Sequence, residues 1–467
     1  MGTIQSDEIA VKENRSNHEK KKLAIIQEFR TNLAKVAAGK STFALSKKTS
    51  NLFRNRKAAK SKKLDVKQLN QVISIDPEAL IAEVEGMITY EDLVNETLKY
   101  NCLPPVVPEL KTITVGGALV GLGIESSSFR YGLVHETIIE IEVLTGDGNV
   151  LTCRADNEYR DLFFAFPNSY GTLGYALKIK MKLIPAKKFI RLTNLRFNDI
   201  NSFFEKLQEF CVKNRSLQTD SYIDGVIFDK TEMYIIVGEP VDEAPFVNNY
   251  TYLNIYYQSI RKNEINYLTT YDYIWRWDAD WFWCSKHFGM NYKILRFLFG
   301  KFMLHSAKYW KIKHLMASNS ILRWLTKPLE KPSESVIQDI LIPFHNTQNF
   351  FTFFQSSIGI TPIWICPSMS YNKDQKYTFC NLDPSTLYID FGFWDIVPSW
   401  KEKGFLNKMI ERKTEELAGF KSLYSDSYYT EEEFWQIYSK NTFLALKAKY
   451  DPQKALKGLF EKCVHKK

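Results

Sequence analysis

The sequence has few cysteines and no long apolar run, and both absences exclude whole classes of protein. Its seven cysteines are odd in number and widely scattered, and no two stand at the spacing of a metal-binding pair. We therefore expect neither a disulfide framework nor a metal site. No stretch approaches about 18 uninterrupted apolar residues, because the most apolar segments are broken by glycines or by Arg296 and Lys301. We expect no transmembrane segment.

The beginning of the chain also lacks the pattern of a secretory signal peptide. Its first apolar patch, Leu23 to Ile26, is short and follows the charged run Lys20 to Lys22. Cytoplasmic residence is therefore the default expectation. The net charge of +9 falls disproportionately on residues 1–63, and such a basic arm can bring a protein peripherally to an anionic membrane. No recognised nucleic-acid-binding motif accompanies these residues, so we expect no nucleic-acid partner.

The chain is instead rich in apolar and aromatic residues. Its 467 residues are 45% apolar and 14% aromatic, which is enough to form two domains with their own cores. Ten tryptophans and 25 tyrosines can line a cavity for a flat or apolar ligand, although an ordinary core uses the same residues.

Periodic patterns predict the elements of an α+β protein. From Leu23 to Val36 apolar residues recur at helical intervals, and this helix either packs on the protein or lies on a membrane; its modest apolar face favours packing. Hairpins are predicted around Asp76-Pro77 and Gly146-Asp147-Gly148, and Thr89 begins a helix-capping pattern. Further strands are predicted over Tyr175–Leu183, Tyr222–Phe228 and Met233–Val237.

One glycine-rich segment is the most informative part of the chain. Gly116, Gly117, Gly121 and Gly123 lie within eight residues, and glycine lets a backbone approach a phosphate or a flat ring closely. Glu125 and the three serines after it supply hydrogen-bond acceptors and hydroxyl donors. This is not the G-x-G-x-x-G pattern of a Rossmann site. By itself the segment fits either a cofactor site or a tight turn capped by serines.

From about Leu103 to Arg191 the sequence resembles the PCMH-type FAD-binding domain of the vanillyl-alcohol-oxidase superfamily, in the branch that contains the sterol Δ24-reductases. Weaker similarity covers most of the remaining chain, as at Gln338-Asp339 and Leu387-Tyr388-Ile389-Asp390. The motifs that carry the resemblance are Pro108-Glu109-Leu110, Thr114-Val115-Gly116-Gly117, Gly123 to Ser128, Tyr131-Gly132-Leu133, Asp161-Leu162-Phe163, Gly171-Thr172-Leu173-Gly174 and Ile184 to Lys188.

The resemblance implies a fold class and a cofactor. It implies an α+β chain with a two-subdomain FAD-binding domain over 46–187 and an α+β cap that binds substrate over 188–467. The basic arm over residues 1–45 departs from the sterol reductases, which begin with a membrane-spanning segment. Noncovalent FAD is expected, because the glycine-rich loop lacks the histidine to which many members attach flavin, the nearest being His135. The residues expected to hold FAD are Thr114, Val115, Gly116, Gly117, Gly121, Gly123, Ile124, Glu125, Ser126, Ser127, Gly132, Gly171 and Gly174, with Ser50 and Asn51 in an earlier pyrophosphate loop.

The resemblance also implies an activity. It implies an FAD-dependent oxidoreductase that takes electrons from NADPH and reduces an isolated carbon–carbon double bond in a lipid. Δ24-sterols are one such substrate, and relatives sharing the segment Trp275-Arg276-Trp277-Asp278 resemble reductases of methylene-branched acyl chains. Two alternatives stay open. An FAD oxidase or dehydrogenase of a sugar, lactone or alcohol predicts a polar pocket and oxygen consumption, and a noncatalytic flavin-binding scaffold predicts no turnover.

Catalytic candidates are predicted in the aromatic segment from Tyr271 to Trp283. Its tryptophans and tyrosines supply flat walls, and Arg276 can anchor a substrate or pair with a neighbouring aspartate. Reduction of an unactivated alkene needs a neutral acid, for which Tyr273 is the first candidate and Asp280 the second. An aromatic core strip with a solvated ion pair explains the same residues.

Overall fold

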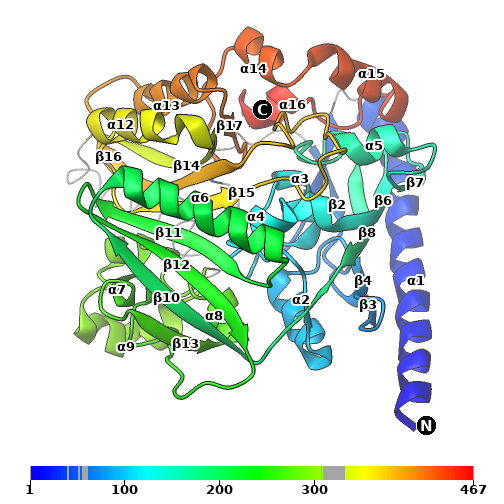
Figure 1. Cartoon of the computed structure of the whole chain (residues 1–467). Helices are drawn as coiled ribbons and strands as arrows, with labels where there is room; N and C mark the ends of the chain where they lie inside the picture. The colour runs from blue at the N-terminus through cyan, green and yellow to red at the C-terminus, as the bar shows by residue number, and fades with distance from the viewer. Residues whose placement is uncertain are drawn as a thin grey trace.

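Two large antiparallel sheets organise the chain in the computed structural model, which describes residues 2–38, 41–50, 53–54, 61–306, 308 and 332–465 (Figure 1). The first sheet has the strand order β3-β4-β8-β6-β7. Its strands are β3 (Val72–Asp76), β4 (Ile81–Glu85), β8 (Tyr175–Lys182), β6 (Ile138–Leu144) and β7 (Val150–Cys153). The predicted hairpins are confirmed, because β3 pairs with β4 and β6 pairs with β7.

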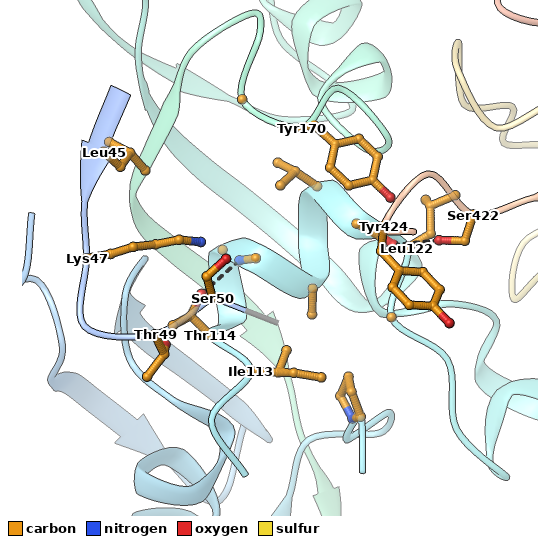
Figure 2. A pocket seen from close by; sticks show the side chains of 18 of the residues that line it. Leu45, Lys47, Thr49, Ser50, Ile113, Thr114, Leu122, Tyr170, Ser422 and Tyr424 are labelled. Carbon is orange, nitrogen blue, oxygen red and sulfur yellow. Dashed lines mark hydrogen bonds between the residues drawn. The ribbon is translucent and has the colours of Figure 1, made fainter. Parts of the chain in front are cut away.

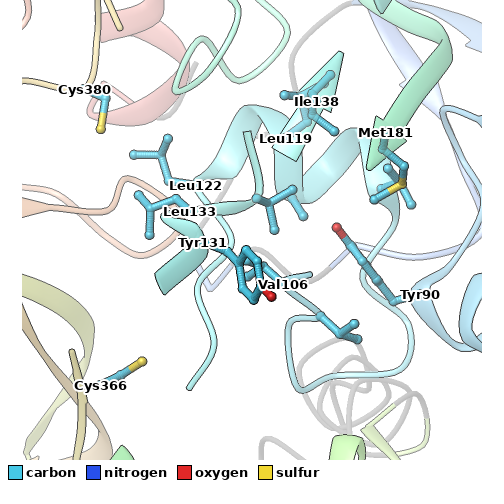
Figure 3. Close-up of a cluster of buried hydrophobic side chains, with 14 of the residues drawn as sticks. Tyr90, Val106, Leu119, Leu122, Tyr131, Leu133, Ile138, Met181, Cys366 and Cys380 are labelled. Carbon is cyan, nitrogen blue, oxygen red and sulfur yellow. The ribbon is translucent and has the colours of Figure 1, made fainter. Parts of the chain in front are cut away.

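Short helices and strands surround the first sheet. The predicted helix after Thr89 is confirmed, since the Thr89 side chain accepts a hydrogen bond from the backbone N–H of Asp92 at the start of α2. Leu119 and Leu122 of the glycine-rich segment lie in the core with Ile138 and Met181 (Figure 3). The surrounding elements are α2 (Tyr90–Thr97), α3 (Val115–Gly121), α4 (Ser128–Tyr131), α5 (Arg160–Ala165), and the small strand pairs β1 (Thr42–Ser46) with β2 (Ser61–Asp65) and β5 (Cys102–Leu103) with β9 (Ile184–Pro185).

The amphipathic helix packs on the protein and is longer than its apolar pattern predicts. It forms α1 (Gly2–Ala38), which lies beside the first sheet in Figure 1. Phe29 of α1 is fully buried and stacks on Phe43 of β1, with 4.1 Å between ring centroids. Lys21 and Lys22 form ion pairs with Glu85 and Glu142 of the sheet. Arg15 and His18, further toward the N-terminus of α1, contact Glu83 and Glu85 of the sheet, so polar contacts continue beyond the apolar stripe.

The second sheet has eight strands in the order β13-β10-β12-β11-β15-β16-β14-β17. The predicted strands at Tyr222 and Met233 are confirmed as β11 and β12. The strands are β10 (Phe189–Phe197), β11 (Tyr222–Asp229), β12 (Glu232–Val241), β13 (Ile265–Thr269), β14 (Ser333–Pro343), β15 (Ile363–Ser368), β16 (Tyr388–Pro398) and β17 (Phe420–Lys421).

The two faces of this sheet differ in chemistry. Its outer face is apolar and is covered by α6 (Ile200–Leu217), α12 (Thr347–Ser357) and α13 (Phe405–Glu416) (Figure 1). We call the opposite side the inner face; it faces the first half of the chain and carries Asp224, Asp339, Trp364, Cys366, Asp390, Gly392 and Trp394. A strand that is buried on both sides normally carries apolar side chains on both faces. Three buried aspartates on one face of this sheet are therefore unusual.

The remaining helices complete both halves. The C-terminal segment crosses back to the first sheet, where Lys447 donates to the carbonyl of Thr172 and Tyr450 to the carboxylate of Asp161. Within the described residues, no helix combines the length and apolar character needed to cross a membrane. These helices are α7 (Tyr256–Ser259), α8 (Thr270–Ile274), α9 (Lys293–Met303), α14 (Glu431–Ile437), α15 (Lys440–Tyr450) and α16 (Leu459–Cys463).

Candidate functional site

A cavity of about 670 Å³ lies between the glycine-rich segment, strands β1 and β2, and the inner face of the eight-stranded sheet. Its volume falls within the range of small-molecule and cofactor sites. Because residues from both halves of the chain line it, the cavity is formed only when the two halves pack together.

The glycine-rich segment forms one wall of the cavity. Thr114 begins α3, and its side-chain oxygen accepts a hydrogen bond from the backbone N–H of Gly117 at 3.2 Å (Figure 2). At Gly121 a Cβ would have 3.9 Å to its nearest neighbour, a ring carbon of Tyr170, so this position opens onto free space. At Gly116 a Cβ would instead lie 2.5 Å from the carbonyl oxygen of Gly86. Gly121 therefore leaves room beside the cavity, whereas Gly116 allows two backbones to pack.

One end of the cavity is cationic. Figure 2 shows Lys47, Thr49 and Ser50 at this end, near Thr114. Lys63 of β2 also lines the cavity, on the strand that pairs with β1 just before Lys47. Arg54 lines a different part of the cavity, because it donates to the carbonyl of Leu423 and lies over the ring of Tyr170. Lysine and arginine side chains together with hydroxyl groups are the usual partners of phosphate oxygens, so this end suits a pyrophosphate.

The other end is aromatic and is formed by the inner face. Asp339, Gly392 and Trp364 are paired side by side across strands β14, β16 and β15. A Cβ at Gly392 would lie 2.6 Å from the ring of Trp394 and 3.1 Å from both Asp339 and Trp364. The missing side chain at Gly392 thus makes room for three cavity-lining side chains in one plane of the sheet.

Asp339 is a buried acid at this aromatic end, and its pKa lies near neutral pH. Burial raises the pKa of Asp339 to about 7, while a hydrogen bond to Tyr424 acts in the opposite direction. Burial and the charge of Asp339 raise the pKa of Asp390 well above its usual range. Within the described residues, Oδ1 of Asp339 and both oxygens of Asp390 have no hydrogen-bond partner. The pair therefore holds a proton at the cavity wall near neutral pH.

Trp281 and Phe282 reach the cavity from a strained turn. Both have left-handed backbone conformations, with φ of 46° and 59°. Backbone hydrogen bonds hold the turn, from Trp281 N–H to Asp278 and from Phe282 N–H to Trp277. The ring of Phe282 stacks on Trp394 with 4.0 Å between centroids. Such conformations cost about 1–3 kcal/mol each and concentrate at functional sites.

A second acid, Glu109, lines the cavity beside a buried ionic network. Burial first, and then the charge of Glu125, raise the pKa of Glu109 well above its usual range. Arg276 donates to Glu125 and to Asp224, each at 2.9 Å, and its guanidinium lies 4.1 Å from the centre of the Tyr273 ring. Arg276 thus links the end of the glycine-rich segment to the inner face.

The structure brings most of the predicted cofactor-binding residues to the cavity. Val115 lies in the core, while Glu125 and Ser127 line a separate pocket the size of one water. Ser126 and Gly132 are among the lining residues of neither space, and Asn51 lies outside the described residues. Those that line the cavity are Ser50, Thr114, Gly116, Gly117, Gly121, Gly123, Ile124, Gly171 and Gly174.

The three predicted catalytic residues lie beside the cavity, and none lines it. The hydroxyl of Tyr273 is 3.0 Å from Ser126 Oγ, which itself donates to Glu125. Asp280 accepts two hydrogen bonds from Arg296, at 2.6 and 2.9 Å. Ion pairs within the segment from Tyr271 to Trp283 are therefore not formed, because its charged residues bind partners elsewhere in the chain.

Sequence reasoning did not place the acids of the cavity. Glu109 lies in the motif Pro108-Glu109-Leu110, and Asp339 and Asp390 lie in segments of weaker family similarity, but no local pattern predicts that these acids come close to one cavity. A signal was present, because Tyr222-Ile223-Asp224-Gly225 and Tyr388-Ile389-Asp390 each place a carboxylate inside a strand of apolar and aromatic residues. A buried carboxylate is costly unless it is paired or protonated, so such a residue is a candidate for function.

Comparisons with known proteins agree with this geometry. Residues 28–154 match the family model described as an FAD binding domain. Human Δ(24)-sterol reductase is 29% identical over 84% of this chain and 76% of its own length. The Δ(24)-sterol reductase of Pisum sativum is 26% identical over 87% of this chain and 77% of its own length. Cytokinin dehydrogenase 7 of Oryza sativa is 32% identical over 30% of this chain.

The matched segment contains the glycine-rich wall, and the similarity to the reductases extends over most of the chain. A phosphate-binding end, a wall with room beside Gly121 and a flat aromatic end together fit FAD. Residues 28–154 therefore form an FAD-binding domain of the PCMH type, and the chain is an FAD-dependent oxidoreductase that is similar over most of its length to the Δ(24)-sterol reductases.

Proposed function

We propose that this enzyme reduces an isolated carbon–carbon double bond in a lipid, with NADPH as electron donor. The observation that carries the proposal is the aromatic end of the cavity, where Trp281, Phe282, Trp364 and Trp394 surround one acid held near neutrality, Asp339. Apolar walls suit an alkene without polar substituents. The similarity to Δ(24)-sterol reductases supports a Δ24-sterol as the substrate, and a methylene-branched acyl chain is the second candidate.

Saturation of an alkene needs a hydride at one carbon and a proton at the other. Bound FAD supplies the hydride chemistry. We propose that Asp339 donates the proton, because it lines the cavity and its pKa of about 7 matches a general acid at neutral pH. Asp390 lies on the same face, and burial together with the charge of Asp339 raises the pKa of Asp390 well above its usual range. Arg276 is a positioning residue, since through Asp224 it fixes the Trp364 ring, whose Nε1 donates to Asp224 at 3.1 Å.

FAD is proposed to bind noncovalently. Among the described residues that line the cavity there is neither a histidine nor a cysteine. His135, nearest in sequence to the glycine-rich loop, is buried and packs edge-on against the ring of Tyr377. Precipitation with acid should therefore release the flavin into the supernatant.

The test is a stepwise anaerobic titration followed by absorbance. NADPH should bleach the flavin bands, and a Δ24-sterol or a methylene-branched phospholipid should restore them with formation of the saturated product. The matched control is the corresponding saturated lipid, which should leave the flavin reduced. Reduction of the flavin by a sugar, lactone or alcohol, followed by rapid reoxidation by oxygen in air and with no response to any alkene, would replace this proposal with the oxidase alternative. A flavin that NADPH never reduces would remove NADPH as the donor.

A further inference from the structure

Helix α9 exposes several large apolar side chains and buries its arginine, which reverses the usual arrangement of a surface helix at these positions. Arg296 is 1% exposed and binds Asp280, whereas Ile294 is 75% exposed and Phe297 65% exposed. The exposed apolar residues on and next to the helix are Tyr292, Ile294, Phe297, Leu298 and Phe299, and we call them the α9 surface.

The α9 surface is held rigidly. Arg296 donates to the carbonyl of Asn254 at 3.0 Å, and the hydroxyl of Tyr252 donates to the carbonyl of Phe297 at 2.6 Å. Both bonds attach the helix to the loop that carries Leu253, which is itself 49% exposed. Several large apolar side chains are thus fixed toward solvent, and a patch of this kind marks a contact surface.

The surrounding sequence is cationic and contains no acid. Between Asp280 and Glu330 there is no aspartate or glutamate, and Lys293 at the start of α9 is exposed. Of the basic residues in this interval whose side chains the structure describes, Lys293 and Lys308 are exposed, whereas Lys286 pairs with Asp395 and Arg296 is buried against Asp280. Apolar side chains bordered by lysines are the composition that binds the interface of an anionic bilayer.

The α9 surface also leads to the cavity. Leu304, which ends α9, packs in one apolar cluster with Leu110 and Trp281, and both of these line the cavity. We propose that α9 docks the enzyme on anionic phospholipid membranes and brings the aromatic end of the cavity to the lipid. This inference rests on the proposed lipid substrate for its purpose, but the docking itself can be measured independently.

The basic N-terminal arm is the less suitable membrane contact. Its apolar residues Ile25, Phe29 and Leu33 are buried on the protein. Arg15, Lys21 and Lys22 are used in ion pairs with the first sheet. Among the side chains of α1 that the structure describes, Ile9 and Leu23 are exposed singly among dispersed charges and do not form a contiguous apolar surface.

Vesicle flotation of the full-length FAD-bound enzyme tests the proposal. The parent should bind vesicles of phosphatidylcholine with phosphatidylserine, bind pure phosphatidylcholine vesicles much less, and dissociate as salt is raised. The variant Ile294→Ser/Phe297→Ser/Leu298→Ser should lose roughly tenfold or more of its bound-to-free ratio, because interfacial binding scales with buried apolar area. Lys293→Glu should weaken binding to the anionic vesicles only.

Matched controls separate docking from chemistry. Lys12→Gln/Lys20→Gln removes exposed charge from α1 and should leave vesicle binding nearly unchanged. The α9 triple variant should keep its FAD content, its reduction by NADPH and its turnover of detergent-dispersed lipid, while turnover of vesicle-embedded lipid falls. Flotation of the triple variant at the parental level would overturn the proposal. The proposal would also be overturned if neither parent nor variant floats and the triple variant instead abolishes a concentration-dependent dimer of the parent. Flotation that depends on α9 without alkene reduction would instead refute the proposed function alone.

Discussion

Asp339 is the residue on which the proposed chemistry depends. Asparagine has nearly the same shape but carries no transferable proton, so Asp339→Asn should lower the rate of alkene reduction by roughly 10²–10⁴-fold. FAD content and reduction by NADPH should stay at parental levels. Stopped-flow reoxidation of the reduced enzyme by the lipid alkene measures the affected step directly. Tyr273→Phe is the control, because the Tyr273 hydroxyl bonds Ser126 beside the cavity.

The pH dependence of the same step gives a second readout. Only protonated Asp339 can donate, so the reoxidation rate should fall as pH rises through about 7, the pKa that burial gives this acid. The residual rate of Asp339→Asn should lose this dependence. If Tyr273→Phe abolishes reoxidation and Asp339→Asn does not, the donor is Tyr273. Glu109 is the other acid that lines the cavity. If Glu109→Gln abolishes reoxidation and the other two substitutions do not, the proton donor is Glu109.

Substitution of Arg276 tests whether the buried ionic network stabilises the fold. Its side chain is inaccessible, and Arg276→Met leaves the nearly inaccessible carboxylates of Glu125 and Asp224 without their cation. Breaking such a buried pair should lower the free energy of unfolding by about 3–5 kcal/mol. The control is Arg191→Met, which breaks a partly exposed pair with Glu239 and should cost under about 1 kcal/mol. Urea unfolding monitored by tryptophan fluorescence compares them, and equal midpoints would contradict this role.

At the scale of elements, the glycines of α3 have two separable functions. Gly121→Leu places a side chain in the free space beside Tyr170, so FAD affinity should fall sharply while the apoprotein still folds. Gly116→Ala forces a Cβ to within 2.5 Å of the Gly86 carbonyl, so the fold itself should lose roughly 1–3 kcal/mol. Flavin content after reconstitution and urea unfolding of the apoprotein measure the two effects. Loss of stability in Gly121→Leu equal to that in Gly116→Ala would refute the distinction.

Local patterns were sufficient to predict many elements. The hairpins and the helix after Thr89 follow from turn and capping residues that act over a few positions. The full length of α1 did not follow, because Lys21 and Lys22 extend its contacts through carboxylates far along the chain. Patterns of apolar residues carry no information about such long-range ion pairs.

The candidate site was predictable only on its glycine-rich wall. More than one hundred residues separate Asp224 from Asp339, and about fifty separate Asp339 from Asp390. These aspartates share one face only because strands β11, β15, β16 and β14 are neighbours in the sheet. Strand order is set by packing of the whole sheet and not by any local signal. From its aromatic segment Asp280 is predicted to be a catalytic candidate, but in the structure it binds Arg296 and does not line the cavity.

At the scale of the whole molecule, the buried acids make stability depend on pH. In the fold Glu109, Asp339 and Asp390 all have raised pKa values, so the native state binds more protons than the unfolded chain. Their stabilising contribution is complete below the ordinary pKa of a carboxylic acid and is lost as pH rises through the folded values. For Asp339, with a folded pKa of about 7, the loss is of the order of 4 kcal/mol.

The stability that is lost as pH rises can be distinguished from the stability that acids with lowered pKa values lose as pH falls. Asp395, whose pKa its partners His287 and Lys286 hold at about 2 despite partial burial, loses its contribution only in strong acid. Between pH 5 and pH 8 the free energy of unfolding should therefore fall for the parent and fall less for Asp339→Asn, because asparagine is neutral throughout. Asp156→Asn, at an exposed carboxylate, is the control and should keep the parental slope. The free energy of unfolding of the apoprotein is measured by urea titration at each pH. If it depends on pH equally in the parent and in Asp339→Asn, Asp339 is ionised in the fold, and the proton donor must then be sought at Glu109.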